Sequence, residues 1–189
     1  MDPDGPSTVA LTIGAPAWRR YLADPEGVCR RAFAATLERV PTPPWLARAE
    51  IGVLLADDAA VRRLNAKHRG QDRPTNVLSF PTFEQILEDA ADHLPPGPVL
   101  LGDVVLALET VRAEAAAESK PFVGHVSHLL VHGCLHLLGY DHETAEDAAR
   151  MERLERAILG QLGIPDPYAH VTERLMTGAA AEPSLETRS

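Results

Sequence analysis

Residues 131–142 read VHGCLHLLGYDH, and the spacing of their histidines predicts both a helix and a metal site. His132 and His136 are four residues apart, so on a helix they lie about 40° apart on one face. Gly139 follows three residues later and can adopt the left-handed conformation that ends a helix. The chain can then turn back and bring His142 towards the same point. We therefore expect one metal ion to bind at the end of this helix.

The ligand set indicates which metal and which chemistry to expect. Three neutral imidazoles and one open position are typical of catalytic zinc, whereas structural zinc is usually closed by four protein ligands. Histidines that are merely packed or solvated are the alternative, but these spacings favour a bound Zn²⁺, one per chain. The pattern overlaps the zinc-protease signature H-E-x-x-H-x-x-G-x-x-H, in which the glutamate is the general base. Here Gly133 takes the place of that glutamate, which counts against a peptidase.

Composition favours a soluble single domain around this site. The chain has 189 residues, of which 45% are hydrophobic and 24% charged. Its net charge of −9 argues against indiscriminate binding to nucleic acid or to an anionic membrane, although a local basic groove is compatible with it. The two cysteines are distant in sequence, so no disulfide framework is expected. With no signal-peptide profile and no membrane-spanning apolar stretch, we expect a cytoplasmic protein without a membrane partner.

Strands are expected early in the chain and helices late. The expected strands cover 8–13, 50–56, 75–80 and 100–108; the expected helices cover 25–40, 109–119, 121–138 and 144–162, with a further one after Asp57. This order predicts an α+β fold, a single domain with a small mixed β-sheet covered by helices and the metal site on a helix of the C-terminal half and the turn after it. The domain is expected over 7–177, between a mobile N-terminus (1–6) and a disordered tail (178–189). Residues 83–98 are acidic and proline-rich and are interpreted as a loop.

Three segments resemble the YbeY family, the zinc-dependent endoribonucleases of bacterial ribosomal RNA maturation. They are the histidine run, NAKHRGQDRPTNVLSFP (65–81) and LLGDVVLAL (100–108), and the resemblance extends over about residues 51–163. It implies a small sheet with the zinc site at the edge of a helix. It also implies action on RNA, at the 3′ end of small-subunit ribosomal RNA, and a part in ribosome quality control. The partners implied are the small-subunit protein uS11 and the GTPase Era.

Residues 62–73 form a basic segment that can contact phosphate. It holds Arg62, Arg63, Lys67, His68, Arg69 and Arg73, opposed by Asp72. We interpret Arg62 and Arg63 as surface charges. Arg69 precedes Gly70 and matches the family's functional arginine, so it is expected to stabilise negative charge on the phosphate in the transition state. Other candidates for substrate contact are Lys67, Arg73, Asn76 and Ser79; for the last two the alternative is that they satisfy backbone groups at a strand edge.

Several polar residues are candidates for supporting the metal ligands. Asp141 is expected to orient a ligand imidazole, and His128, one turn before His132, to support a ligand or to pack. His125 is expected to be solvated. Asp103 lies in an apolar strand, where a buried charge needs a partner, either Arg69 or a histidine. Cys134 is expected to face away from the metal and into the core.

The resulting hypothesis is a zinc-dependent, single-strand-specific endoribonuclease. Either hydroxide attacks phosphorus directly, or it deprotonates the adjacent 2′-OH, which would spare 2′-deoxy substrates. No general base is evident from the sequence. Two alternatives remain: a metallopeptidase or amidohydrolase built on the same three histidines, and a non-catalytic ribosome-assembly factor with a stabilising metal.

Overall fold

The computed structural model describes residues 8–83, 94 and 96–169 of the chain. The expected mobile ends over 1–6 and 178–189 lie outside the described residues, as does most of the expected loop over 83–98. No described helix combines the length and the apolar character needed to cross a membrane.

One mixed sheet of four strands forms the centre of the fold, in the order β1-β2-β4-β3. Strands β1 (Thr8–Ile13), β2 (Ala49–Ala56) and β4 (Val99–Ala107) are parallel, and β3 (Val77–Pro81) pairs antiparallel with β4 at one edge. The strands lie close to their predicted positions, and the α+β class is confirmed. Their order depends on pairing between distant segments, which the sequence pattern leaves open.

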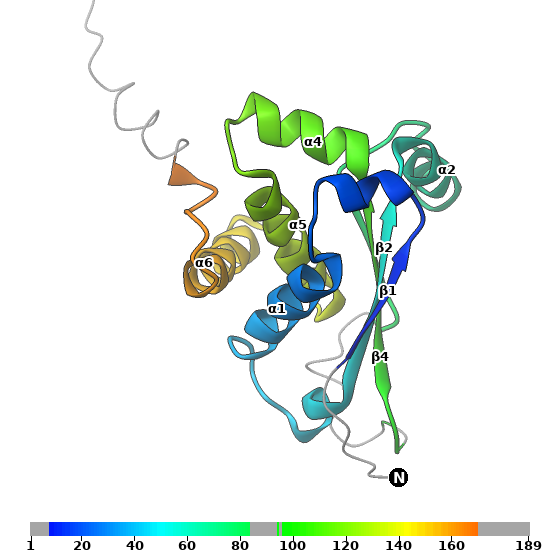
Figure 1. Cartoon of the computed structure of the whole chain (residues 1–189). Coiled ribbons are helices and arrows are strands. Elements are labelled where there is room, and N and C mark those ends of the chain that lie inside the picture. The colour runs from blue at the N-terminus through cyan, green and yellow to red at the C-terminus, as the bar shows by residue number, and fades with distance from the viewer. Residues whose placement is uncertain (1–7, 84–93, 95, 170–189) are drawn as a thin grey trace, which may run out of the picture.

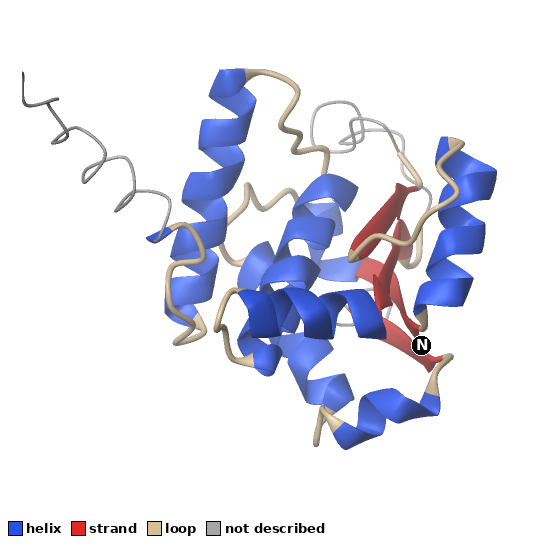
Figure 2. Ribbon diagram, turned by 90° about the horizontal axis from the view of Figure 1, so that it is seen from above, coloured by secondary structure: helices blue, strands red, loops and turns tan. Residues whose placement is uncertain are grey.

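Helices cover the two faces of the sheet unequally (Figures 1 and 2). On one face lie α1 (Pro25–Leu37) and α5 (Phe122–Leu137), and α4 (Leu108–Ala117) and α6 (Ala145–Gln161) pack around α5. The other face carries α2 (Asp58–Arg69), which contacts β4. We call the α5 side the inner face and the α2 side the outer face.

The main core lies between the inner face and the helices. It contains large side chains that are at most 1% exposed, among them Trp18, Phe33, Leu130 and Leu135. Cys134 of α5 is buried in this core, as predicted. A second, smaller cluster lies under α2 on the outer face, around Val61, Leu78 and Val105. Because α5 is central and mostly buried, the positions of its polar side chains are fixed by packing on several sides.

Side-chain caps begin helices α2 and α6. The Asp57 side chain accepts a hydrogen bond from the Ala60 amide at 2.7 Å at the start of α2. The Thr144 hydroxyl accepts one from the Asp147 amide at 3.2 Å at the start of α6. Helix α1 ends at Leu37 instead of the predicted residue 40, before the prolines that follow. Two short 3-10 helices, η1 (Pro16–Arg20) and η2 (Pro44–Arg48), were not predicted, because five residues are too few to show a periodic pattern.

Candidate metal centre

His132 and His136 of α5 and His142 beyond its end form a compact cluster. Each offers one ring nitrogen, and these three atoms lie within 4.8 Å of one another. The Nε2 atoms of His132 and His136 are 3.1 Å apart. Two nitrogens bound tetrahedrally to one zinc at about 2.0–2.1 Å would be roughly 3.3 Å apart. The cluster has the three side chains typical of a catalytic site, and its donor set fits a zinc ion.

The turn after α5 brings His142 back to the helix. Gly139 has φ 90°, in the left-handed region that glycine favours. Its amide donates to the His136 carbonyl at 3.0 Å, and the Tyr140 amide donates to the Leu135 carbonyl at 3.0 Å. This pair of bonds is the Schellman pattern, which satisfies carbonyls at the helix end. The predicted role of the glycine is therefore confirmed, and the His142 ring lies 5.1 Å from the His136 ring, centroid to centroid.

Glu155 of α6 is the principal residue to which the sequence interpretation gave no role, although it belongs to the part of the last helix that resembles the family. It is 1% exposed, and its Oε1 lies 2.7 Å from Nδ1 of His132. Its other oxygen lies 3.4 Å from Nε2 of His128 and accepts a hydrogen bond from the Tyr168 hydroxyl. Burial raises the pKa of this carboxyl, but the hydrogen bonds from His128, His132 and Tyr168 outweigh burial and lower the pKa to about 2. Glu155 is thus an ionised acceptor beside the cluster.

A signal for Glu155 was present in the sequence. It lies four residues after Met151 and three before Ile158, both of which are apolar and buried on α6. A charged residue on a buried helix stripe needs a partner, because burial of an unpaired charge is costly. Histidines on a neighbouring helix are suitable partners.

The cluster favours uncharged imidazole at His136. Burial, together with the neighbouring His132 and His142, lowers the pKa of His136 to about 4. An imidazole binds a metal only in its neutral form, so this environment suits a ligand. The hydrogen bond from Nδ1 of His132 to Glu155 similarly leaves Nε2 of His132 free to face an ion.

Gly133, the residue after the first histidine, faces the sheet. A Cβ at this position would lie 2.8 Å from Cγ1 of Val104 and 3.1 Å from Oγ of Ser79. The close approach of α5 to β3 and β4 therefore leaves no room for a side chain. The glutamate that the zinc-protease pattern has at this position would not fit into this packing.

The basic segment lies on α2 and the turn that follows it. Arg69 ends α2 and is exposed, and its Nη2 donates to the Ser79 carbonyl of β3 at 3.5 Å. Lys67 is exposed, and Arg73 donates to the side chain of its neighbour Gln71 at 3.1 Å. Arg62 forms a two-bond ion pair with Asp72 on the surface, at 2.7 and 2.8 Å, in line with its interpretation as a surface charge.

Asn76 and Ser79 have roles within the fold. The Asn76 side chain accepts from the Val77 amide at 2.7 Å and donates to Oε2 of Glu114 at 3.0 Å. Both polar ends of this amide are engaged, as in the alternative interpretation. Ser79 is 9% exposed and its hydroxyl points towards α5 beside Gly133. Neither side chain is presented openly to a substrate.

The other candidates for supporting the metal ligands differ in whether they lie near the cluster. Asp141 lies beside the cluster: its Oδ1 accepts from the His142 amide at 2.7 Å and is 3.8 Å from Nδ1 of that ring. His128 contacts the carboxylate of Glu155 and not one of the three clustered histidines. Asp103 is exposed on the outer face of β4, and among the described residues it makes no hydrogen bond or ion pair with Arg69 or a histidine. The expectation of a buried, partnered Asp103 was wrong, because α2 covers only part of that face.

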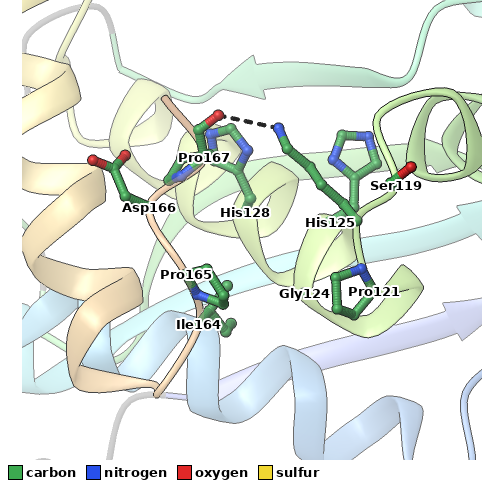
Figure 3. A pocket seen from close by; sticks show the side chains of 10 residues that line it. Ser119, Pro121, Gly124, His125, His128, Ile164, Pro165, Asp166 and Pro167 are labelled. Atoms are coloured by element: carbon green, nitrogen blue, oxygen red, sulfur yellow. Dashed lines mark hydrogen bonds between the residues drawn. The ribbon is translucent and has the colours of Figure 1, made fainter. Parts of the chain in front are cut away.

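His125 also differs from its prediction. It is 5% exposed rather than solvated, because α4 packs against the first turns of α5. Its Nε2 lies 2.9 Å from Oε2 of Glu114, a residue of α4. Figure 3 shows His125 and His128 at a cavity of about 240 Å³ between α5 and residues 164–167, where Lys120 donates to the Pro167 carbonyl at 3.2 Å. The ligand cluster does not line this cavity.

Comparisons with known proteins agree with this architecture. A family model described as Endoribonuclease YbeY matches residues 25–163. A protein of that name from Bradyrhizobium diazoefficiens is 50% identical over 167 residues, which cover 88% of this chain and 87% of the relative. One from Paramagnetospirillum magneticum is 48% identical over 160 residues, covering 85% and 94%. The solution structure of TM1509 from Thermotoga maritima matches 94% of this chain and 99% of its own, with a TM-score of 0.50 and 21% identity, which supports the fold alone.

Proposed function

This chain belongs to the Endoribonuclease YbeY family, and from that membership we propose that it is a zinc-dependent, single-strand-specific endoribonuclease. Its substrate would be ribosomal RNA, at the 3′ end of the small-subunit RNA, in maturation and in ribosome quality control. The observation that carries the proposal is the convergence of three ring nitrogens within 4.8 Å, on residues that the family model covers.

Nε2 of His132, Nε2 of His136 and a ring nitrogen of His142 would hold the zinc. When bound, zinc supplies Lewis acidity and makes water acidic enough to act as a nucleophile near neutral pH. Glu155 is a positioning residue: its carboxylate holds the proton on Nδ1 of His132 and fixes the ring orientation. Asp141 would restrain the chain at His142 from the exposed side, because its carboxylate accepts a hydrogen bond from the His142 amide.

Arg69 would neutralise the negative charge that develops on the phosphate. Its guanidinium is exposed and rests against β3, the strand that packs on α5 beside Gly133. Lys67 and Arg73 are exposed on the same segment and would contact neighbouring phosphates of the strand. This local basic surface would bind RNA despite the net charge of −9.

Two other functions can be weighed against this one. A peptidase on the same histidines is disfavoured, because Gly133 packs against Val104 where the protease pattern has its general base. An assembly factor that binds RNA without cutting it would need the metal only for stability. The three-ligand cluster favours the enzyme, since structural zinc commonly has four protein ligands.

The test is a cleavage assay with the zinc-loaded protein. Its substrates are a labelled single-stranded RNA, its 2′-deoxy version and casein, and its controls are chelated protein, His136→Ala and Arg69→Ala. We expect RNA cleavage that is lost on chelation and in both variants. Cleavage that survives in both variants would identify a contaminating nuclease, and cleavage of casein would support the peptidase. A spared 2′-deoxy strand would indicate attack by the 2′-OH.

The cellular setting is proposed from the family alone. We place the protein in the cytoplasm, with the small-subunit protein uS11 and the GTPase Era as partners. Binding of purified uS11 and Era to this chain, compared with an unrelated ribosomal protein, tests this part separately from catalysis.

A further inference from the structure

We propose that a pocket on the outer face of the sheet binds a guanine base of the RNA strand. The pocket has a volume of about 400 Å³ and lies between α2 and strands β2, β3 and β4. Its lining is Leu54, Leu64, His68, Phe80, Asp103 and Val105. This inference rests on the proposed function, because it names a further contact with the same RNA substrate.

Two aromatic rings form one side of the pocket. Phe80 is half-buried and His68 is exposed, with ring centroids 5.2 Å apart and planes inclined by 65°. A planar base can stack on one of these rings while its edge meets the other. Leu54 and Leu64 add apolar contact from β2 and α2. Aromatic side chains that stack unpaired bases are the usual means of holding single-stranded RNA.

One carboxylate lines the same pocket as this aromatic pair. Asp103 lies directly opposite Phe80 in the β3–β4 pairing and beside Gly52 in the β2–β4 pairing. A Cβ on Gly52 would lie 2.0 Å from Oδ1 of Asp103, so the carboxylate occupies space that the glycine leaves open. Asp103 is exposed and takes part in no hydrogen bond or ion pair with another described residue. Its two oxygens are therefore available to a ligand.

A carboxylate beside a stacked base selects guanine. Guanine presents two adjacent donors, N1–H and the N2 amino group, which two carboxylate oxygens can accept together. Adenine and cytosine present one amino donor next to a ring nitrogen acceptor, and uracil presents one N–H between two carbonyls. In these three bases an acceptor would face the carboxylate and repel it.

The pocket and Gly133, the residue after His132, lie on opposite faces of the edge strand β3. Ser79 and Phe80 are successive residues of the edge strand β3, so their side chains point to opposite faces. Ser79 faces α5 beside Gly133, and Phe80 faces the pocket. Arg69, which follows the pocket residue His68, contacts the Ser79 carbonyl at 3.5 Å. A strand of RNA that crosses this edge would place a phosphate at Arg69 and a neighbouring base in the pocket.

The test measures binding separately from cleavage. Zinc-loaded protein is titrated into short, labelled, nuclease-resistant U-rich oligonucleotides that carry a single G, A, C or inosine, and binding is followed by fluorescence anisotropy. We expect the G-containing strand to bind about 10-fold more tightly than the A-containing one, with inosine between them because it lacks the N2 amino group. Asp103→Asn should remove this preference.

Three further variants test whether the preference for G comes from the pocket or from a general change in charge or packing. Glu26→Gln removes one exposed negative charge on α1, far along the chain from the pocket, and should keep the preference for G. Gly52→Ala keeps every charge but displaces the Asp103 carboxylate, so it should reduce the preference. Phe80→Leu keeps an apolar side chain in the outer cluster and should weaken binding of every strand about 5-fold or more.

Equal binding of the four strands would overturn the proposal that this pocket binds guanine. An undiminished preference for G in both Asp103→Asn and Gly52→Ala would overturn it as well. If RNA is cleaved without any base preference, the pocket fails and the nuclease stands. If the preference depends on Asp103 but no RNA is cleaved, the pocket stands and the nuclease fails.

Discussion

Glu155 of α6 accepts a hydrogen bond from Nδ1 of His132 of α5 at 2.7 Å, and this bond joins two helices at the metal cluster. The carboxylate is 1% exposed. It also accepts a hydrogen bond from the Tyr168 hydroxyl and lies beside Nε2 of His128. A buried acceptor of this kind selects one tautomer of a ligand imidazole and holds the ring in place. The last helix therefore contributes a carboxylate to the candidate metal site and is not only a cover for α5.

We expect Glu155→Gln to weaken metal affinity about 10- to 100-fold, because the amide is a poorer acceptor and no longer holds the His132 ring firmly. The measurement is a zinc titration against a chelating dye, with circular dichroism to confirm folding. Glu152→Gln is the matched control, since Glu152 pairs with Arg156 on the surface of the same helix at 3.2 Å. Equal zinc affinity in wild type and Glu155→Gln would show that this bond does not support the ligand.

The sequence predicted the three clustered histidines, but it did not predict that Glu155 holds one of them in place. The positions of His132, His136 and His142 follow from helical spacing and one glycine turn, which are local features. The role of Glu155 depends on how α6 packs against α5, a contact between residues 23 apart in the chain. Long-range packing of this kind leaves only an indirect trace in sequence, here a charge on an apolar helix stripe.

The order of the strands and the exposure of their side chains were also hard to predict, because both depend on contacts between distant segments. Alternation and apolar runs located the four strands, but the order β1-β2-β4-β3 depends on pairings between distant segments. Asp103 was expected to be buried because its strand is apolar on both sides. It is exposed, because the single helix α2 covers only part of the outer face, and no pattern within β4 could reveal that.

Both cysteine thiols should be unreactive in the folded protein. Burial raises the pKa of Cys29 to about 12, and burial also raises the pKa of Cys134 far above its ordinary range. The thiolate is the reactive form, and at about pH 8 each thiol therefore stays protonated as well as inaccessible. We expect negligible labelling by a thiol-disulfide dye in native protein and labelling of both cysteines in denaturant. Rapid native labelling would contradict the buried positions of the two residues.

Removing the metal should lower the thermal stability of the protein. A ligand that binds only the folded state stabilises it by about 2.7 kcal/mol when present at 100 times its dissociation constant. Differential scanning calorimetry with and without a chelator should show a fall in melting temperature that added zinc reverses. His142→Ala is expected to remove most of this difference while leaving α5 intact, because His142 lies after the helix end and is exposed. A melting temperature unaffected by chelation would argue against a bound metal.

Gly133→Ala should destabilise the fold, whereas Gly160→Ala should not. A Cβ at position 133 would lie 2.8 Å from Cγ1 of Val104, within the packed layer between α5 and the sheet. Overpacking a core in this way costs about 1–3 kcal/mol, against the roughly 0.5–1 kcal/mol that alanine gains over glycine inside a helix, so the net effect should be destabilising.

Gly160 of α6 is the matched control for that substitution. A Cβ there meets no atom within 4 Å, so alanine should increase stability by about 0.5–1 kcal/mol through its better helix propensity. Urea unfolding of both variants gives the two free energies. Opposite signs are expected; if Gly133→Ala were as stable as wild type, α5 would lie farther from β4 than the structure has it. The interpretation of Gly133 as a packing residue would then lose its basis, and the argument against a protease would rest on the missing glutamate alone.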